Sequence, residues 1–529
     1  MDTKGLDRRN FLKLSGAGAG LVLVRNAPAI AATTAATGQV FQHGVSSGDP
    51  MPGAVLIWTR VTPSSEALPG SGVGKETEVQ WQVSKDRTFR KLVAHGVSVA
   101  RKERDHTVKV DVRGLNDGQR YFYRFKAKQE VSPIGRTTTA PPLGADVANL
   151  RFGLASCANW EGGYFSAYRY LSEREDLSFV LHMGDYLYEY GPGAYGADGI
   201  DRVHQPDHEI VTLADYRIRH AQYKTDPDLQ ACHAAHPFIS AWDDHEVTND
   251  TWREGAENHQ EEEGNFDNRR DRAYRAYFEW MPVRRPRPQK DPHRIYRRLS
   301  FGALADLHML DTRQYRDVQP SSRIDQSRHD EERTITGEAQ MAWLKNGLEK
   351  SDTAWHLIGN QLMITPWETG EGVPFNVDSW DGYTADRQDL LSHIQDKKIS
   401  NVVFLTGDIH TSWANDVPID DNTYPVTPSV AVEMVGPSIT SDNADDITGS
   451  PPRTTSIALE QEIKVDNPWV KYVELDSHGY SIVDVTSERL NVDWYFISDR
   501  TDPKATQMFG ASWKTDAGSN SVTAGEGPI

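Results

Sequence analysis

Cysteine is scarce in this sequence, because only Cys157 and Cys232 occur in 529 residues. One bridge between them would add little stability to so long a chain, although their spacing alone does not exclude the pairing. We favour a free Cys157. It ends an apolar run, LRFGLAS, at a point where a thiolate could bind a metal ion.

Positive charge is also in short supply, since 57 lysines and arginines face 76 aspartates and glutamates, for a net charge of −19. No global positive field would attract a phosphate backbone, which excludes a general nucleic-acid binder. A small anionic substrate stays compatible with this balance, because bound metal ions can outweigh distant surface charge.

Long apolar runs are missing beyond the N-terminus, so we expect no membrane span in the mature chain. The N-terminus itself carries paired arginines in DRRNFLK (7–13), a weakly apolar stretch and a small-residue site, Ala29-Ile30-Ala31. A short core helix is the alternative, but its glycines would weaken it. The segment resembles a bacterial twin-arginine export signal. That resemblance predicts a signal peptide over 1–31, export by the twin-arginine machinery and a periplasmic or secreted location.

The region 40–140 has the pattern of an all-β domain. Short strand-like runs such as AVLIWTRV, VQWQVS and RYFYRFKA are separated by turns rich in glycine, aspartate and proline. LNDGQRYFYRF, with Leu115 and Tyr121, looks like a tyrosine corner of immunoglobulin-like or fibronectin-like sandwiches. We therefore predict an N-terminal β-sandwich over 40–140, joined to the rest by a linker at 140–146.

From residue 149 onward, apolar strands end in polar, glycine-rich turns. Three amphipathic segments with helical periodicity lie between them: RRDRAYRAYFEWM, GEAQMAWLKNGLEKS and YTADRQDLLSHIQ. Strands that are apolar on both faces indicate a layered α/β domain, which we expect to extend over 149–511. The final segment, 512–529, is polar and rich in glycine and serine, and is predicted to be a flexible tail.

Polar side chains gather where these predicted strands end. In an α/β fold the carboxyl ends of strands meet at one edge, so residues distant in sequence become neighbours. Each residue alone has an ordinary explanation: Asp185 and Asp408 could cap helices, and a histidine is usually a satisfied polar residue. Together, however, they form a metal-ligand set: Cys157, Asp185, Tyr188, Asp243, Asp244, His245, Asn249, Asp408 and His410.

Several motifs resemble those of known phosphoesterases. GDYLY (184–188) is similar to the G-D-x-x-Y motif of purple acid phosphatases, and GDIH (407–410) stands in the place of the metallophosphoesterase G-H-x-H motif. Together with FQHGVSSGDP, ASCANW, DDHEVTND and LDTRQYR, they make the chain resemble the PhoD family of alkaline phosphatases. The resemblance implies a metallophosphoesterase-like α/β sandwich of two mixed sheets flanked by helices, with the N-terminal β domain in front.

The same resemblance implies a role for each ligand. Asp185 bridges two metals, Cys157, Tyr188 and His410 complete an iron shell, and Asp408 and Asn249 bind the second metal. A phenolate and a thiolate together favour Fe(III). Because aspartate replaces the usual histidine at position 408, the second site is rich in oxygen and suits Ca(II).

His245 and Arg313 are the predicted catalytic residues. His245 could be a ligand, a general acid or a supporting partner. Arg313 could clamp phosphate oxygens or form a buried ion pair with Asp311. Of the remaining candidates, Tyr186 is expected to pack in the core, whereas three residues that end strand-like runs could line the site: Asn360, Gln361 and His478.

The resemblance implies a phosphatase with phosphodiesterase activity that acts on small phosphate esters. Two metal ions can activate a hydroxide for direct attack on phosphorus, so no nucleophile from the chain is required. Two alternatives stay open: a phospholipase-D-like phosphodiesterase that uses the same site, and a non-catalytic cell-surface binding protein with a degenerate enzyme domain.

Overall fold

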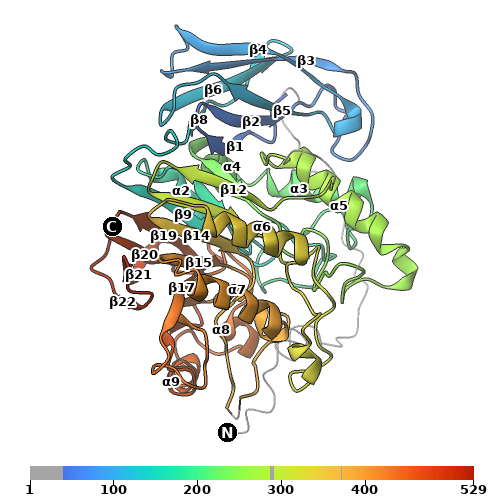
Figure 1. Cartoon of the computed structure of the whole chain (residues 1–529). Coiled ribbons are helices and arrows are strands. Elements are labelled where there is room, and N and C mark those ends of the chain that lie inside the picture. The colour runs from blue at the N-terminus through green and yellow to red at the C-terminus, as the bar shows by residue number, and fades with distance from the viewer. Residues whose placement is uncertain (1–39, 286–290, 371) are drawn as a thin grey trace.

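Two stacked β-sheets form the centre of this computed structural model, which describes residues 40–529 except 286–290 and 371 (Figure 1). The signal peptide predicted over 1–31 lies outside the described residues. The larger sheet has ten strands in the order β22-β21-β20-β19-β9-β10-β11-β1-β2-β5. Its strands are β1 (Val45–Met51), β2 (Ala54–Arg60), β5 (Thr107–Arg113), β9 (Leu150–Ala155), β10 (Val180–His182), β11 (Pro237–Ser240), β19 (Gly479–Val485), β20 (Arg489–Ile497), β21 (Gln507–Asp516) and β22 (Val522–Ala524).

The second sheet has seven strands in the order β12-β13-β14-β15-β17-β16-β18. They are β12 (Arg297–Phe301), β13 (Ala305–Met309), β14 (Trp355–Asn360), β15 (Val402–Thr406), β16 (Ser412–Pro418), β17 (Ser429–Val435) and β18 (Val470–Glu474). Both sheets are mixed, with parallel pairing of β9, β10 and β11 in one and of β13, β14, β15 and β17 in the other. The predicted mixed sheets are therefore present.

A continuous apolar core lies between the two sheets. Phe152 and Phe179 of the ten-stranded half stack at 4.7 Å between ring centroids, and Phe179 stacks on Phe301 of the seven-stranded sheet at 5.0 Å. Strands β10 and β15 are buried along their whole length. Burial on both faces explains why their sequences read as unbroken apolar runs rather than as alternating ones.

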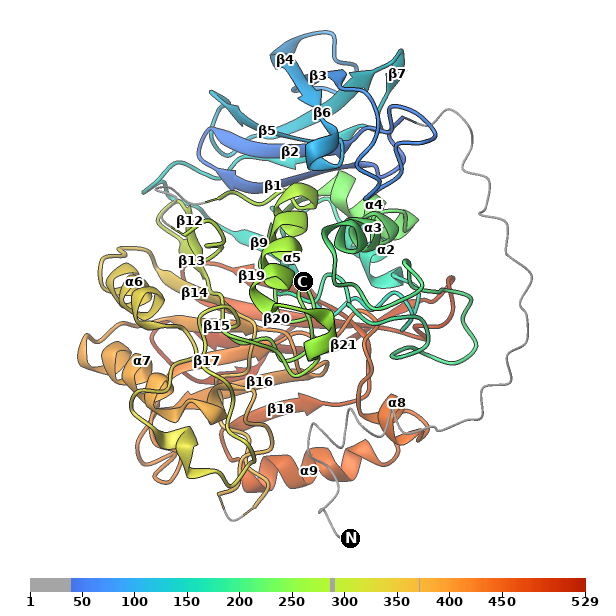
Figure 2. The same cartoon turned by 90° about the vertical axis from the view of Figure 1, so that its right-hand side faces the viewer.

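Helices cover the outer faces of the sheets, with α6 and α7 on one side and α2, α3 and α4 on the other (Figure 2). The three predicted helical segments tested by the structure become α5, α6 and α7. Their starts follow local signals, such as the Asn265 side chain that accepts from the backbone of Asn268 at the N-terminus of α5. The helices are α2 (Ser166–Glu173), α3 (Leu213–Tyr223), α4 (Pro227–Ala235), α5 (Phe266–Trp280), α6 (Glu338–Glu349), α7 (Thr384–Asp396), α8 (Ala444–Thr448) and α9 (Ser456–Asp466), with 3-10 turns η1 (Lys102–Arg104), η2 (Glu261–Glu263), η3 (Gln326–His329) and η4 (Trp380–Gly382).

The N-terminal region forms a third sheet of five strands, at the top of Figure 1. It packs over β1, β2 and β5 with an apolar core of its own, and the Tyr121 hydroxyl accepts from the backbone N–H of Asn116 at 2.9 Å, as in a tyrosine corner. The strands are β3 (Thr77–Ser84), β4 (Leu92–Ala100), β6 (Arg120–Ala127), β7 (Glu130–Val131) and β8 (Gly135–Thr138).

This β region is not separate from the central sheet. β1 pairs in parallel with β11, through Ser47 opposite Pro237 and Gly48 opposite Phe238. A side chain at Gly48 would collide with the carbonyl oxygens of Pro282 and Phe238, at 2.3 and 2.7 Å, so only glycine permits this close pairing. The boundary expected near 140–149 therefore separates two sequence patterns but not two sheets.

The predicted flexible tail is wrong. Residues 512–529 continue β21, form β22 and end with the Ile529 N–H donating to Asp493 at 2.6 Å. The prediction relied on polar composition. An edge strand, however, is held mainly by backbone hydrogen bonds, which polar residues form as well as apolar ones do. Within the parts of the chain that the structure describes, no helix combines the length and the apolar character needed to cross a membrane.

Candidate metal centre

Four strand ends from the two sheets meet at one place. β9 leads to Cys157, β10 to Asp185, β11 to Asp243 and Asp244, and β15 to Asp408. Their donor atoms fall into three groups, in each of which every donor lies within 4.8 Å of the others. Because two of the groups share Asp185 and two share Asp244, the groups form one continuous centre. They are Cys157–Asp185–His410, Asp185–Asp244–His245 and Asp243–Asp244–Asp408.

The backbone is strained at four of the predicted ligands. Cys157, Asp185, Asp408 and His410 have φ values of 59°, 52°, 62° and 63°, in the left-handed region that side-chain-bearing residues rarely adopt. Each such residue costs about 1–3 kcal/mol, and such strain gathers at functional sites. The glycine before Asp185 is equally constrained, because a Cβ at Gly184 would lie 2.4 Å from the Cβ of Asp243. Gly-Asp therefore brings two ligand loops into contact.

The two tyrosines of GDYLY point to different places. The Tyr188 hydroxyl lies 3.0 Å from Asp185 Oδ2 and 3.3 Å from His410 Nε2, and it accepts a hydrogen bond from Ser441 Oγ at 2.6 Å. The Tyr186 hydroxyl lies 2.8 Å from a ring nitrogen of His233, inside the core. Of the two, only Tyr188 lies among the candidate ligands.

The oxygen atoms of the centre leave room for a cation. Asp185 Oδ1, Asp243 Oδ2 and Asn249 Oδ1 are buried and, within the described chain, none accepts a hydrogen bond. The side-chain amide nitrogen of Asn249 donates to Glu257 at 3.3 Å, so its Oδ1 is not used in that contact. Buried oxygens cost free energy unless they are paired or bind metal, so this donor set fits metal ions.

The pKa values of the buried acidic groups in the centre also fit a metal site. Burial, followed by repulsion from Asp244 and Asp408, raises the pKa of Asp185 to about 7. Burial and the charge of Asp185 also raise the pKa values of the Cys157 thiol and the Tyr188 phenol well above their usual range. Without a polyvalent cation, the Cys157 thiol and the Tyr188 phenol hold their protons. Metal binding would have to release those protons.

Glu189 holds His245 at the edge of the centre. Its carboxylate lies 2.7 Å from His245 Nδ1 and also accepts the backbone N–H of Asn249 at 2.8 Å. Although burial opposes it, the charges of Glu189, Asp244 and Asp185 raise the pKa of His245 well above its ordinary value. Glu189 was not among the predicted site residues, even though it directly follows Tyr188 in the sequence.

Arg313 forms buried ion pairs, but with other carboxylates than the predicted Asp311. It is fully buried and its guanidinium donates to Asp243, to Asp378 at 2.8 Å and to Asp408 at 2.9 Å. Asp311 instead accepts the backbone N–H of Arg313 at 3.1 Å. All three guanidinium nitrogens are engaged by carboxylates, so Arg313 offsets part of the negative charge of the centre.

Family models decide what kind of protein carries this centre. One described as PhoD-like phosphatase matches residues 152–494, and its N-terminal companion, PhoD-like phosphatase, N-terminal domain, matches residues 26–141. The chain belongs to the PhoD-like phosphatase family. The resemblance drawn from the sequence motifs is thereby confirmed, and the chain is a phosphatase, a hydrolase of phosphate esters.

Individual relatives agree with this assignment. The chain is 38% identical to alkaline phosphatase D of Bacillus subtilis (strain 168) over 524 residues, which cover 96% of this chain and 87% of the relative. A solved structure of PhoD matches with a TM-score of 0.84 and 36% identity, over 94% of each chain. A purple acid phosphatase from yellow lupin seeds matches at 12% identity and a TM-score of 0.52, over 89% of this chain and 73% of that one, and shows a shared fold only.

Other residues considered from the sequence take supporting positions in this PhoD-like phosphatase. Asn360 is buried and bonds to Trp380 and Leu362, and Gln361 bonds to Thr312, so neither faces the donor groups. His478 Nε2 donates to the backbone carbonyl of Ser441 at 2.9 Å, and the Ser441 hydroxyl in turn donates to Tyr188. Both cysteines are free, so Cys157 is available as a ligand.

Two acidic residues of the centre were included in the predicted metal-ligand set but given no individual role. Asp243 and Asp244 lie shortly after β11 and belong to groups of donors that could hold a metal ion. Glu246, two residues later, accepts the backbone N–H groups of Asp185, Tyr186 and Asp243 and so ties two loops together. The repeated acids in DDHE were the available signal.

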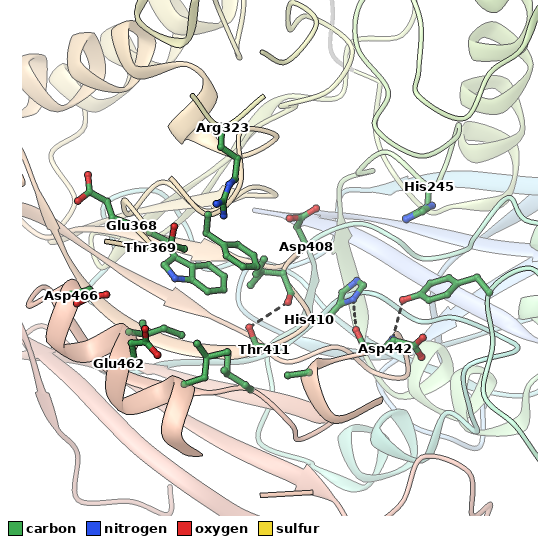
Figure 3. Close-up of a pocket in the computed structure, with 18 of the residues that line it drawn as sticks. His245, Arg323, Glu368, Thr369, Asp408, His410, Thr411, Asp442, Glu462 and Asp466 are labelled. Atoms are coloured by element: carbon green, nitrogen blue, oxygen red, sulfur yellow. Dashed lines mark hydrogen bonds between the residues drawn. The ribbon is translucent and has the colours of Figure 1, made fainter. Parts of the chain in front are cut away.

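A pocket opens from the centre. Asp408, His410 and His245 form one end of it, and aromatic and aliphatic side chains extend from there to an acidic rim (Figure 3). The volume of this pocket is about 100 Å³. The donor groups of the phosphatase are therefore accessible to a small ester.

Proposed function

We propose that the chain is an exported, metal-dependent phosphatase of the alkaline phosphatase D type that hydrolyses phosphate monoesters and diesters. The observation that carries this proposal is the continuity of the three donor groups through Asp185 and Asp244, beside an open pocket. The 38% identity to alkaline phosphatase D supports the reaction class.

The donor set favours two different metals. Cys157, Tyr188 and His410 would hold Fe(III), with Asp185 shared between both ions. Asp408, Asn249 and Asp244 supply carboxylate and amide oxygens, which suit Ca(II). When bound, such a pair supplies Lewis-acid stabilisation of phosphoryl charge and lowers the pKa of water.

The side chains of the phosphatase prepare this chemistry. Glu189 fixes the His245 ring through Nδ1 and keeps it protonated, so that the other ring nitrogen can donate a proton within the pocket. Arg313 fixes Asp243 and Asp408 and offsets part of their repulsion. Ser441 orients the Tyr188 hydroxyl, and Glu246 holds the loops of Asp185 and Asp243 at a fixed separation.

Export is supported by the sequence features of residues 1–31, which resemble a twin-arginine signal. Because this route carries folded proteins, metal loading would precede export and Cys157 would be loaded in a reducing compartment. We propose a periplasmic or secreted location, with an N-terminal β domain over 40–140 and a catalytic domain that starts at 149 and includes the C-terminal strands.

The decisive experiment uses protein exported by its own signal. Metal analysis is expected to find iron and calcium, and phenolate bound to Fe(III) gives a visible absorption band. The holoenzyme should hydrolyse both p-nitrophenyl phosphate and its bis-ester. An Asp185→Asn variant should lose iron, calcium and both activities.

The possible contrary results differ in meaning. A colourless, zinc-only and fully active enzyme would overturn the metal assignment. Faster turnover of phosphatidylcholine than of either p-nitrophenyl ester would favour the phospholipase-D-like alternative. A metal-loaded protein that hydrolyses none of these esters would refute the proposed activity and revive a binding role.

A further inference from the structure

The pocket beside the metal centre has two chemically different ends. At one end lie Asp408, His410 and His245, where the phosphoryl group must sit if the proposed function holds. The other end holds no metal-ligand group among the residues described. Whatever alcohol the phosphoryl group is esterified to must therefore occupy this second end.

An aromatic wall forms the nearer part of the second end. Trp367 stacks on Phe375 with ring centroids 3.7 Å apart and planes inclined by 13°, and it also contacts Trp413 at 4.9 Å. The indole N–H of Trp413 donates to Thr411, the residue after His410, at 2.7 Å. The wall is thus joined to the ligand loop and its position is fixed relative to the phosphoryl site.

Helix α9 forms the opposite wall. Leu459, Glu462, Ile463 and Asp466 all line the pocket, at the spacing that places side chains on one helical face. Leu459 and Ile463 continue the apolar surface, whereas Glu462 and Asp466 are exposed at its rim. A face of this kind offers contact to an apolar body and repels negative charge.

The other charged side chains around the pocket also leave its rim with more negative than positive groups. Glu368 also lines the pocket. Arg323 projects into the pocket between Glu368 and Asp408 (Figure 3). The rim therefore carries three carboxylates, Glu368, Glu462 and Asp466, and one guanidinium, which lies between Glu368 and Asp408.

We propose that this pocket is a subsite for the alcohol portion of the substrate, and that it takes an aromatic or alicyclic group that carries no negative charge. This inference rests on the proposed function, since the metal centre fixes where the phosphoryl group lies. The stacked rings bind the flat or apolar body, and the rim of Glu368, Glu462 and Asp466 disfavours a carboxylate or a further phosphate.

The first test reverses the charge of the rim without touching the core. Four monoesters serve as probes: phenyl, 4-carboxyphenyl, 4-(aminomethyl)phenyl and ethyl phosphate. In the Glu462→Lys/Asp466→Lys holoenzyme, the preference in kcat/KM for phenyl over 4-carboxyphenyl phosphate should fall about 5-fold, as expected for charges roughly 10 Å apart at moderate salt. The preference in kcat/KM for 4-(aminomethyl)phenyl phosphate over phenyl phosphate should fall as well.

A matched control carries the same change of charge elsewhere. Glu261→Lys/Glu262→Lys alters two carboxylates on the exposed turn η2, which does not line the pocket. It should leave the three kcat/KM ratios of phenyl phosphate to the other esters within about twofold of the unmodified enzyme, the limit for screened distant charges. Equal shifts in both double variants, or no shift in either, would overturn the role of the rim.

The second test removes apolar contact. Leu459→Ala, at a half-buried helical position, should raise KM for phenyl phosphate about 5-fold and change that for ethyl phosphate less than twofold, because only the ring reaches the wall. Equal effects on both esters would count against an apolar subsite.

A binding measurement separates failure of this inference from failure of the proposed function. Ligand-observed NMR with benzyl alcohol and benzoate requires no turnover. The holoenzyme should bind benzyl alcohol more tightly than benzoate, and the rim variant should narrow that difference. If esters are hydrolysed but neither the NMR nor the kinetic preferences change, the phosphatase stands and the subsite is refuted. If no ester is hydrolysed while benzyl alcohol is still preferred, the subsite stands and the activity fails.

Discussion

Replacing Tyr188 by phenylalanine tests the predicted iron shell through a count of protons. The substitution removes one ionisable oxygen that lies 3.0 Å from Asp185 and 3.3 Å from His410. The pKa values of the Tyr188 phenol and the Cys157 thiol are both raised, chiefly by burial and then by Asp185, so both groups are protonated in the metal-free protein at pH 8. Binding as phenolate and thiolate must release both protons.

The expected magnitude follows from these states. At pH 8 the unmodified protein should release about two protons per ferric ion, and Asp185, with a pKa of about 7, adds only ~0.1 proton because it is already ionised. Glu246, with a pKa of about 8, can add a further fraction. That fraction is common to all variants. Tyr188→Phe should therefore release about one proton fewer than the unmodified protein.

The assay adds ferric citrate to demetallated protein whose fold is checked by circular dichroism. Proton release is followed in weakly buffered solution against a protein-free blank. Tyr186→Phe is the matched control, because Tyr186 is equally buried in the same loop but bonds to His233 instead. It should match the unmodified protein and keep the visible band, which Tyr188→Phe should lose. Identical proton release and identical spectra for all three proteins would refute Tyr188 as a ligand.

Three further predictions concern the surrounding charges. Glu189→Gln removes the main charge that raises the pKa of His245, so the His245 ring should lose its proton at lower pH. The alkaline limb of the kcat/KM profile should then move to lower pH. An unmoved limb would exclude His245 as the general acid. Burial lowers the pKa of Lys224 from 10.5 to about 7. Between these two pH values the unfolded state binds more protons than the folded state, so the free energy of unfolding should rise with pH. Denaturant titrations should show a rise of about 2–3 kcal/mol from pH 7 to 9. Lys224→Met should lack this increment, and an unchanged pH dependence would show that Lys224 stays charged in the fold. Arg313→Gln should cost about 3–5 kcal/mol of unfolding free energy by leaving buried carboxylates uncompensated, and a loss below about 1 kcal/mol would contradict its neutralising role.

Local sequence patterns were sufficient for the strands that carry the ligands. LSFVL and NVVFLT are apolar on both faces, and each is followed by Gly-Asp, so β10, β15 and their polar ends were predictable. The helical segments α5, α6 and α7 were predictable for the same reason, because periodic apolar spacing is a local property. The failed prediction at 512–529 concerns an edge strand, whose stability depends on a neighbour that is distant in sequence.

Partner identity was much harder to predict than residue type. The sequence indicated that Arg313 carries a functional charge, but offered Asp311 or a substrate phosphate as its partner. The fold instead surrounds it with Asp243, Asp378 and Asp408, which come from three other segments. Glu189 was missed because a glutamate in a loop is usually solvated, and only the approach of the loop after β11 places His245 against it.

The sequence by itself determined the family, the strand ends and the chemical character of the ligands, because motif spacing and apolar periodicity are written in neighbouring residues. Only the tertiary structure decided which donors share a site, that Tyr188 and not Tyr186 reaches it, and that an aromatic pocket with an acidic rim adjoins it. These properties arise from contacts between segments as much as 250 residues apart, such as Tyr188 with Ser441. Such contacts are fixed by the packing of two sheets and not by any local pattern.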